Sequence, residues 1–101
     1  MISRKEAYQQ RTRARLEFIQ SRILKLETRT AKTDADIKVR FDQKLDEIRG
    51  QYAQTMEKLD ELEKATTDSW LVVKSDVDEA LNALSEAVDV IAQNVPVRSK
   101  E

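Results

Sequence analysis

Apolar side chains recur along most of this chain at alternating steps of three and four residues. From Leu16 to Ile37 they follow an a/d heptad with threonine at two core positions, which is typical of a helix with one apolar face. Between Ile37 and Leu45 the steps become four and four, and such an extra residue locally relaxes a left-handed supercoil. The heptad then resumes as far as Thr66. This pattern predicts one long helix over residues 4–65.

A second apolar stripe, in a shifted register, follows from Trp70 onward. Between the stripes, threonine and serine can cap a new helix, and Asp68 suits its first turn because the carboxylate faces the positive end of the helix dipole. Pro96 cannot continue a helix. We therefore predict a second helix over 68–94 and a short tail over 95–101. No glycine or proline enforces the break between the stripes, so one continuous helix is the alternative.

The two stripes predict an all-α fold in which residues 1–101 form a single coiled-coil unit. At about 1.5 Å per residue the longer helix would be on the order of 90 Å long, so the shorter one can fold back over its C-terminal half only. The N-terminal half would leave an apolar stripe that is too long to stay exposed. We expect a helical hairpin, an antiparallel coiled coil of one long and one shorter helix. It would assemble as an antiparallel dimeric helical bundle in which two copies cross near residues 34–37.

The apolar positions of the heptads assign residues to two interfaces. Those expected between the copies are Leu16, Ile19, Ile23, Leu26, Thr30, Thr33, Ile37 and Phe41. Those expected in the core of the hairpin are Leu45, Ile48, Tyr52, Leu59, Leu62, Trp70, Val73, Val77, Leu81, Leu84, Val88 and Ile91. Each end of the expected dimer is then a three-helix bundle built from both chains.

Composition and charge agree with exposed helices. Charged residues make up 37% of the chain, with a single glycine and a single proline, which argues against a turn-rich β fold. Residues 1–33 carry nine basic and three acidic side chains, a net charge of +6. Residues 34–101 carry nine basic and sixteen acidic ones, a net charge of −7. The opposite charges suggest that the two parts pair, and they favour antiparallel copies over parallel ones.

Several kinds of chemistry lack their usual residues. The chain has no cysteine and no histidine, which excludes thiolate metal sites and removes the usual general base near neutral pH. No glycine-rich loop is present to bind phosphate. The acidic run from Asp76 to Asp89 is expected to be a solvated helix face, because side chains on a helix point apart. We expect no enzyme activity, no cofactor and no metal.

Membrane association is not expected either. The longest apolar run, residues 70–73, is too short to span a bilayer, and residues 1–15 lack the apolar stretch of a secretory signal. The polar side of the second helix is acidic, and anionic lipids repel it. We expect a cytoplasmic protein.

Two features of the sequence allow for the binding of a ligand. Trp70, the only tryptophan, either fills the junction between the helices, which is the favoured interpretation, or offers a stacking platform for a ligand or nucleotide. Arg11, Arg15 and Arg22 lie near one face of the first helix, with Arg13 displaced from it, and such a face can contact phosphates. Nucleic-acid binding through this end of the helix is therefore the alternative function. The acidic second helix, however, can neutralise these arginines.

The segment around the tryptophan also carries a family resemblance. It reads Leu59-x-x-Leu62-x-x-Ala65, Asp68-Ser69-Trp70 and Val73-Lys74-x-x-Val77-x-x-Ala80-Leu81-x-x-Leu84-x-x-Ala87. It resembles a widespread family of small bacterial coiled-coil proteins described as a stress-response family first named in cyanobacteria. The resemblance covers roughly residues 10–92. It departs at Thr66 and Thr67, where members often have a small residue or glycine, and at Ser75 or Asp76, where many have glycine.

The resemblance implies a bacterial, cytosolic, non-enzymatic protein connected with stress, and it implies no mechanism. Together with the heptads, it leads us to expect a structural or interaction protein that acts through helix–helix self-association. The expected partner is a second copy, which makes a homodimer. Other protein partners stay open, whereas nucleic-acid and membrane partners are not expected.

Overall fold

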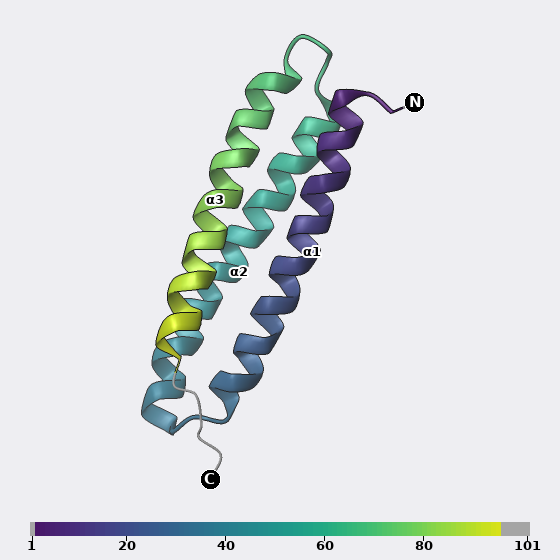
Figure 1. The fold of residues 1–101 in the computed structure, drawn as a ribbon. Coiled ribbons are helices and arrows are strands. Elements are labelled where there is room, and N and C mark those ends of the chain that lie inside the picture. Colours follow the sequence, from purple (N-terminus) through teal and green to yellow (C-terminus); the bar gives the residue numbers. More distant parts are fainter. Residues whose placement is uncertain (1, 96–101) are drawn as a thin grey trace.

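The structure, a computed structural model, describes residues 2–95 of the chain. This part is all-helical, as the sequence predicts, and holds no strand. The three helices are α1 (Arg4–Ala31), α2 (Ala35–Lys64) and α3 (Trp70–Asn94). Helices α1 and α3 run in the same direction and α2 runs in the opposite one, so that they form an elongated bundle with one connection at each end (Figure 1). The bundle measures 55 × 24 × 15 Å.

The expectation of one helix over residues 4–65 is wrong, because the chain reverses direction between α1 and α2. Lys32 ends α1 with φ −98° and ψ 3°, and Asp34 is extended, with φ −63° and ψ 155°. The amide and the hydroxyl of Thr33 both donate to the carbonyl oxygen of Thr30, at 3.1 and 2.7 Å. These bonds satisfy a carbonyl group that the end of a helix leaves open. No described residue has a positive φ, so the turn forms without glycine.

This turn changes how the N-terminal apolar stripe is covered. Helix α1 folds back along its own chain, and its apolar face packs against α2 and α3. Of the residues expected between two copies, Leu16, Ile19, Ile23, Leu26 and Thr30 are buried in this bundle, Thr33 lies in the turn, and Ile37 and Phe41 are half-buried on α2. The three-helix bundle expected from two chains is thus formed by one. A second copy is not needed to cover the stripe.

The other connection lies where the sequence predicts a break. Thr66 and Ser69 hold it through reciprocal hydrogen bonds: the Thr66 amide donates to the Ser69 hydroxyl at 3.1 Å, and the Ser69 amide donates to the Thr66 hydroxyl at 3.2 Å. The predicted place of Asp68 in the first turn of the helix is wrong, because α3 begins later and its first turn has no acidic residue. Pro96, the residue predicted to end this helix, lies outside the described residues.

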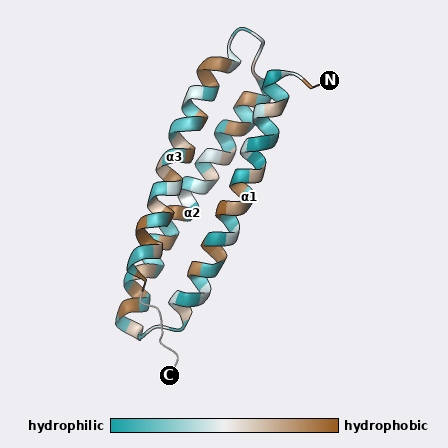
Figure 2. Cartoon of the chain, in the orientation of Figure 1, coloured by the Kyte–Doolittle hydropathy of each residue, from teal (hydrophilic) through white to brown (hydrophobic). Residues whose placement is uncertain are grey.

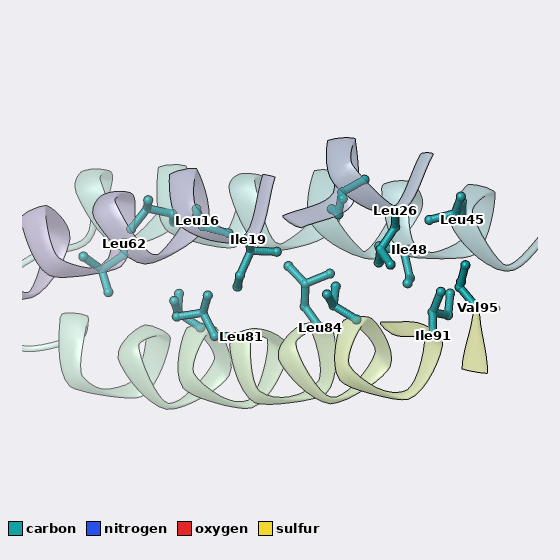
Figure 3. Packing of buried hydrophobic residues seen from close by; sticks show 14 of the residues in the cluster. Leu16, Ile19, Leu26, Leu45, Ile48, Leu62, Leu81, Leu84, Ile91 and Val95 are labelled. Atoms are coloured by element: carbon teal, nitrogen blue, oxygen red, sulfur yellow. The ribbon is translucent and has the colours of Figure 1, made fainter. Parts of the chain in front are cut away.

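The residues expected in the hairpin core lie along the α2–α3 interface. Nine of them are buried, namely Leu45, Ile48, Leu59, Leu62, Val77, Leu81, Leu84, Val88 and Ile91, while Tyr52, Trp70 and Val73 are half-buried against them. Hydrophobic and hydrophilic positions alternate along each helix (Figure 2). Side chains from α1, such as Leu16 and Ile19, point into the space between the helices together with Leu81 and Leu84 of α3 (Figure 3). Each fully buried side chain of this size stabilises the fold by about 1.5–3 kcal/mol.

The start of α1 is fixed by a capping box. The Ser3 hydroxyl accepts a hydrogen bond from the Glu6 amide, and the Glu6 carboxylate accepts one from the Ser3 amide, both at 3.1 Å. Such a reciprocal pair satisfies two amides that the first turn of a helix leaves open. The first residues of α1 lie beside the α2–α3 connection (Figure 1), and the Lys5 ammonium donates to the carbonyl oxygens of Glu63 and Ala65 there. One of the surface hollows lies at this end of the bundle.

Candidate interaction surfaces

Three of the arginines that were considered for phosphate binding are engaged within the chain. Arg22 forms an ion pair with Asp89 of α3 at 2.7 Å, and Arg13 pairs with Glu63 of α2. Arg15 donates to two polar side chains of α3 at 3.3 and 3.5 Å. The basic helix therefore lies against acidic and polar partners of its own chain, and these guanidinium groups are less available to a nucleic acid.

Tyr8 is the centre of a polar cluster near the start of α1. Its hydroxyl donates to the Asp78 carboxylate at 2.5 Å, and the Lys74 ammonium donates to the same carboxylate at 3.0 Å. The ammonium also lies 5.1 Å from the centroid of the Tyr8 ring, within the range of a cation–π contact. The Trp70 ring lies beside this cluster, with its centroid 6.4 Å from that of Tyr8.

The cluster shifts two pKa values in opposite directions. Burial, and then the hydrogen bond to Asp78, raise the pKa of Tyr8 well above its ordinary value. For Asp78, burial acts to raise the pKa, but the hydrogen bonds from Tyr8 and Lys74 and the positive charge of Lys74 outweigh it and leave the pKa lowered. Asp78 therefore stays ionised and Tyr8 stays neutral, which fixes the direction of their hydrogen bond.

Beside this cluster the surface is hollowed, with a volume of about 710 Å³. We call this the N-terminal hollow, because it lies between the first turns of α1, the α2–α3 connection and the start of α3. Its apolar lining comes mainly from Tyr8, Trp70 and Leu71. Its charged lining consists of Arg4, Lys5, Arg11 and Lys74, and no acidic residue lines it. Trp70, at the start of α3, is half-buried against the core and also lines this hollow.

A second concave surface runs between α2 and α3. Two hollows of about 520 and 600 Å³ share Lys44, Val90 and Ile91, so they form one continuous groove, which we call the α2–α3 groove. Ile37 and Phe41 line one end of it, and the small side chains Ala83 and Ala87 line the other. Val90 in the middle is 53% exposed. Two residues expected between copies, Ile37 and Phe41, therefore lie on an open surface after all.

The charges along this groove are arranged in two groups. Arg40 and Lys44 lie toward the end near the α1–α2 turn, and Glu47 and Glu86 lie toward the middle of the bundle. Within residues 2–95 none of these four side chains forms an ion pair with another part of the chain. The groove therefore presents a basic and an acidic part side by side, both open to an outside partner.

Other kinds of site find less support in this geometry. Among the described residues, no three or more acidic side chains come together to hold a metal ion. None of the described helices is both long enough and apolar enough to cross a membrane. A cytoplasmic location stays a prediction.

No protein-family model matches the chain, and neither does any curated protein or any solved structure. The resemblance to the bacterial stress-response family therefore stays a prediction. We therefore infer a function from the N-terminal hollow and the α2–α3 groove.

Sequence reasoning missed Tyr8 as a core residue, although a signal was present. Tyr8, Thr12 and Leu16 are spaced by four residues and are all buried, so the apolar face of α1 begins two turns earlier than the heptad indicated. No comparable spacing in the sequence indicates that the cations around the N-terminal hollow come together. They come together only because the start of α1 meets the start of α3.

Proposed function

We propose that this chain is a non-enzymatic interaction protein that acts through helix–helix self-association, with a second copy seated on the α2–α3 groove. The observation that carries the proposal is the groove itself, a long concave surface between two helices with an exposed valine in its middle and small residues at one end. Grooves of this kind accept a helix that inserts apolar side chains at intervals of about three or four residues. Small residues such as Ala83 and Ala87 let the backbone of the incoming helix approach closely.

The charges favour a second copy as the occupant. If two copies meet with their α2 helices antiparallel across a twofold axis, the basic part of one groove faces the acidic part of the other. Lys44 of each copy then lies opposite Glu47 of the other. An interface of this type is self-complementary, because the same patch serves both copies. The pairing gives ion partners to charges that have none within the described chain.

The dimer expected from the sequence is related to this fold by an exchange of helices. If the turn at residues 32–34 opened into a continuous helix, α1 of each copy would occupy its place on the other copy, and each end would keep the same three layers. That exchange requires the closed bundle to open, whereas pairing through the groove leaves every helix where it is. We therefore assign self-association to the groove, and the exchanged dimer becomes an outcome of the test.

The test compares two valines on the same helix. Val90 lies in the groove and is 53% exposed, while Val72 lies outside it and is 68% exposed. Val90→Glu should abolish self-association in sedimentation velocity runs, because it places a carboxylate in the middle of an apolar contact. Val72→Glu should sediment like the wild type. Circular dichroism should show the same helicity for all three proteins.

Three results would contradict the proposal. A wild-type protein that stays monomeric up to its solubility limit would exclude self-association. Equal loss of association in the two variants would show that the groove is not the interface. A dimer that survives Val90→Glu would favour exchange of α1. In that case spin labels at Ser21 of the two copies should lie on the order of 40 Å apart, since each label sits about 14 residues from the crossing.

Nucleic-acid binding, the alternative, is not proposed, because Arg13, Arg15 and Arg22 are already engaged by α2 and α3. A connection with stress stays a prediction that rests on the resemblance alone.

A further inference from the structure

We infer that the N-terminal hollow binds a small organic anion that joins an aromatic ring to a phosphate or carboxylate group. This site is separate from the α2–α3 groove, since the two surfaces share no residue. It is also independent of self-association. Its shape, its apolar lining and its charges each point to this chemistry.

The volume and lining of the hollow suit a small molecule. Small-molecule sites commonly measure about 300–1,000 Å³ and combine apolar walls with a few polar groups, and the hollow measures about 710 Å³. Trp70 is only half-buried, and Leu71 is 60% exposed. A tryptophan and a leucine left open beside a tyrosine form an apolar surface on which a flat ring can lie.

The charges of the hollow point to an anion. Its lining contains four cations and no acid. Two of the cations are engaged: Lys5 donates to the carbonyl oxygens of Glu63 and Ala65 at 3.1 and 2.7 Å, and Lys74 donates to Asp78 at 3.0 Å. The engaged lysines still contribute positive potential. Direct contact with the anion is therefore expected from the two arginines of the lining.

The other two cations of the hollow, Arg4 and Arg11, have no ion-pair partner in the described part of the chain. They are seven residues apart on α1, so they lie on the same face, separated by about two turns. A guanidinium group presents paired N–H donors that match the oxygens of a phosphate or carboxylate. Either arginine can therefore hold the charged group of a ligand whose ring lies on Trp70.

Tyr8 keeps this site in shape. Its hydroxyl is held by Asp78 and its ring contacts Lys74, so the ring cannot turn away from the hollow without breaking these contacts. The Asp78 carboxylate, the acid of this cluster, is neutralised by Lys74 and does not line the hollow. An incoming anion therefore meets no unpaired negative charge from this cluster.

The single tryptophan makes the site directly observable. In ¹H–¹⁵N NMR spectra the Trp70 indole N–H gives one isolated signal, which can be followed while phenyl phosphate is added. Inorganic phosphate, which has the charge without the ring, and benzyl alcohol, which has the ring without the charge, serve as probes of each half. Phenyl phosphate should shift the signal to saturation, and each half alone should bind at least about tenfold more weakly, a difference of 1.4 kcal/mol or more.

Substitutions then test the role of the arginines. Arg11→Gln should weaken phenyl phosphate binding about tenfold, as expected when a charge-assisted hydrogen bond is lost. Arg29→Gln is the matched control, because Arg29 is exposed in the last turn of the same helix and does not line the hollow. The control should bind like the wild type.

Three outcomes would overturn the inference. Phenyl phosphate that leaves the indole signal unchanged would show that the hollow binds no such ligand. Equal affinity for inorganic phosphate would reduce it to a simple anion site. Equal losses from Arg11→Gln and Arg29→Gln would show that net charge alone attracts the probe.

Discussion

The hydroxyl of Tyr8 on α1 donates a 2.5 Å hydrogen bond to the carboxylate of Asp78 on α3. This bond joins two helices that run in the same direction and are not consecutive in the chain (Figure 1). It lies at the edge of the core, where Tyr8 is only 6% exposed. The bond therefore fixes how the first turns of α1 sit against α3, and with them the shape of the N-terminal hollow.

Tyr8→Phe should lower the free energy of unfolding by about 1.5–3 kcal/mol, because a hydrogen bond to a charged group contributes about this much. Asp78 would keep Lys74 as a partner, which limits the loss. Tyr52→Phe is the control, since the Tyr52 hydroxyl makes a longer, 3.3 Å bond to the neutral Gln20 side chain. Urea unfolding measures both variants. Equal losses of stability in the two variants would show that the bond to Asp78 stabilises the fold no more than the bond to Gln20 does.

The lowered pKa of Asp78 gives the fold a dependence on pH. A carboxyl group whose pKa is lower in the folded state stabilises that state above its unfolded pKa of about 3.9. This stabilisation should disappear as the pH falls through the lower folded pKa. Urea unfolding across this acidic range should show a smaller loss of stability in Asp78→Asn than in the wild type. Asp76→Asn, an exposed site on the same helix, should follow the wild type; an unchanged profile for Asp78→Asn would contradict the assignment.

The turn between α1 and α2 can be tested by proline. Ala35 is the first residue of α2, and Asp34 before it is extended, with ψ 155°, which suits a residue that precedes proline. Ala35→Pro should therefore leave stability unchanged or raise it by about 0.5 kcal/mol. Ala53→Pro, an exposed site inside α2, should cost about 3 kcal/mol. If Ala35→Pro were equally costly, a continuous helix over residues 4–65 would be the better description.

Gly50 offers a gain in stability. It lies within α2, and a Cβ atom added there would meet nothing within 4 Å. Gly50→Ala should raise the free energy of unfolding by about 0.5–1 kcal/mol, because alanine loses less backbone entropy in a helix. Thermal unfolding followed by circular dichroism measures the change. A lower melting temperature would show that another chain approaches α2 closely at this position.

The all-helical class and most of the core could be predicted from the chain, because an apolar stripe with steps of three and four residues is buried as one face of a helix. Leu45, Leu59 and Leu84 follow that spacing and are buried. The turn at Thr33 and Asp34 could not be recognised from spacing, since Thr30, Thr33 and Ile37 keep the heptad phase across it. Only the adjacent Thr33 and Asp34, both common before a helix, hinted at a new start. A turn that keeps the phase lets one chain make the contacts that otherwise need two.

The concave surfaces were harder to foresee, because each depends on residues from different helices. No short-range sequence pattern indicates that Arg4 and Arg11 lie beside Trp70, because they are far from it in the chain. The hollow forms only where the capped start of α1 meets the start of α3. In the α2–α3 groove, Phe41 follows the apolar stripe and was expected in an interface. Val90 falls outside the core positions of α3, so the spacing of apolar residues did not predict that it lies in an interaction surface.

The charges of the groove allow self-association to be tested by reversing the charges at Lys44 and Glu47. In the proposed dimer Lys44 of each copy faces Glu47 of the other, so every substitution acts at two symmetric contacts. Lys44→Glu places four acidic side chains at these contacts and Glu47→Lys places four basic ones, and each lost ion pair is worth up to about 1 kcal/mol. Loss of two pairs, together with the repulsion between like charges, should therefore weaken dimerisation of each variant alone by about tenfold.

An equal mixture of the two variants is the most direct test of pairing through the α2–α3 groove. At one contact of the mixed dimer the carboxylate introduced at position 44 faces the ammonium group introduced at position 47, and at the other the native Lys44 faces the native Glu47. Sedimentation velocity of each variant and of the mixture, at matched total concentration, measures the effect. The predicted result is weak association of each variant alone and recovery of the dimer in the mixture. A mixture that associates no better than its components, or single variants that dimerise like the wild type, would contradict this pairing.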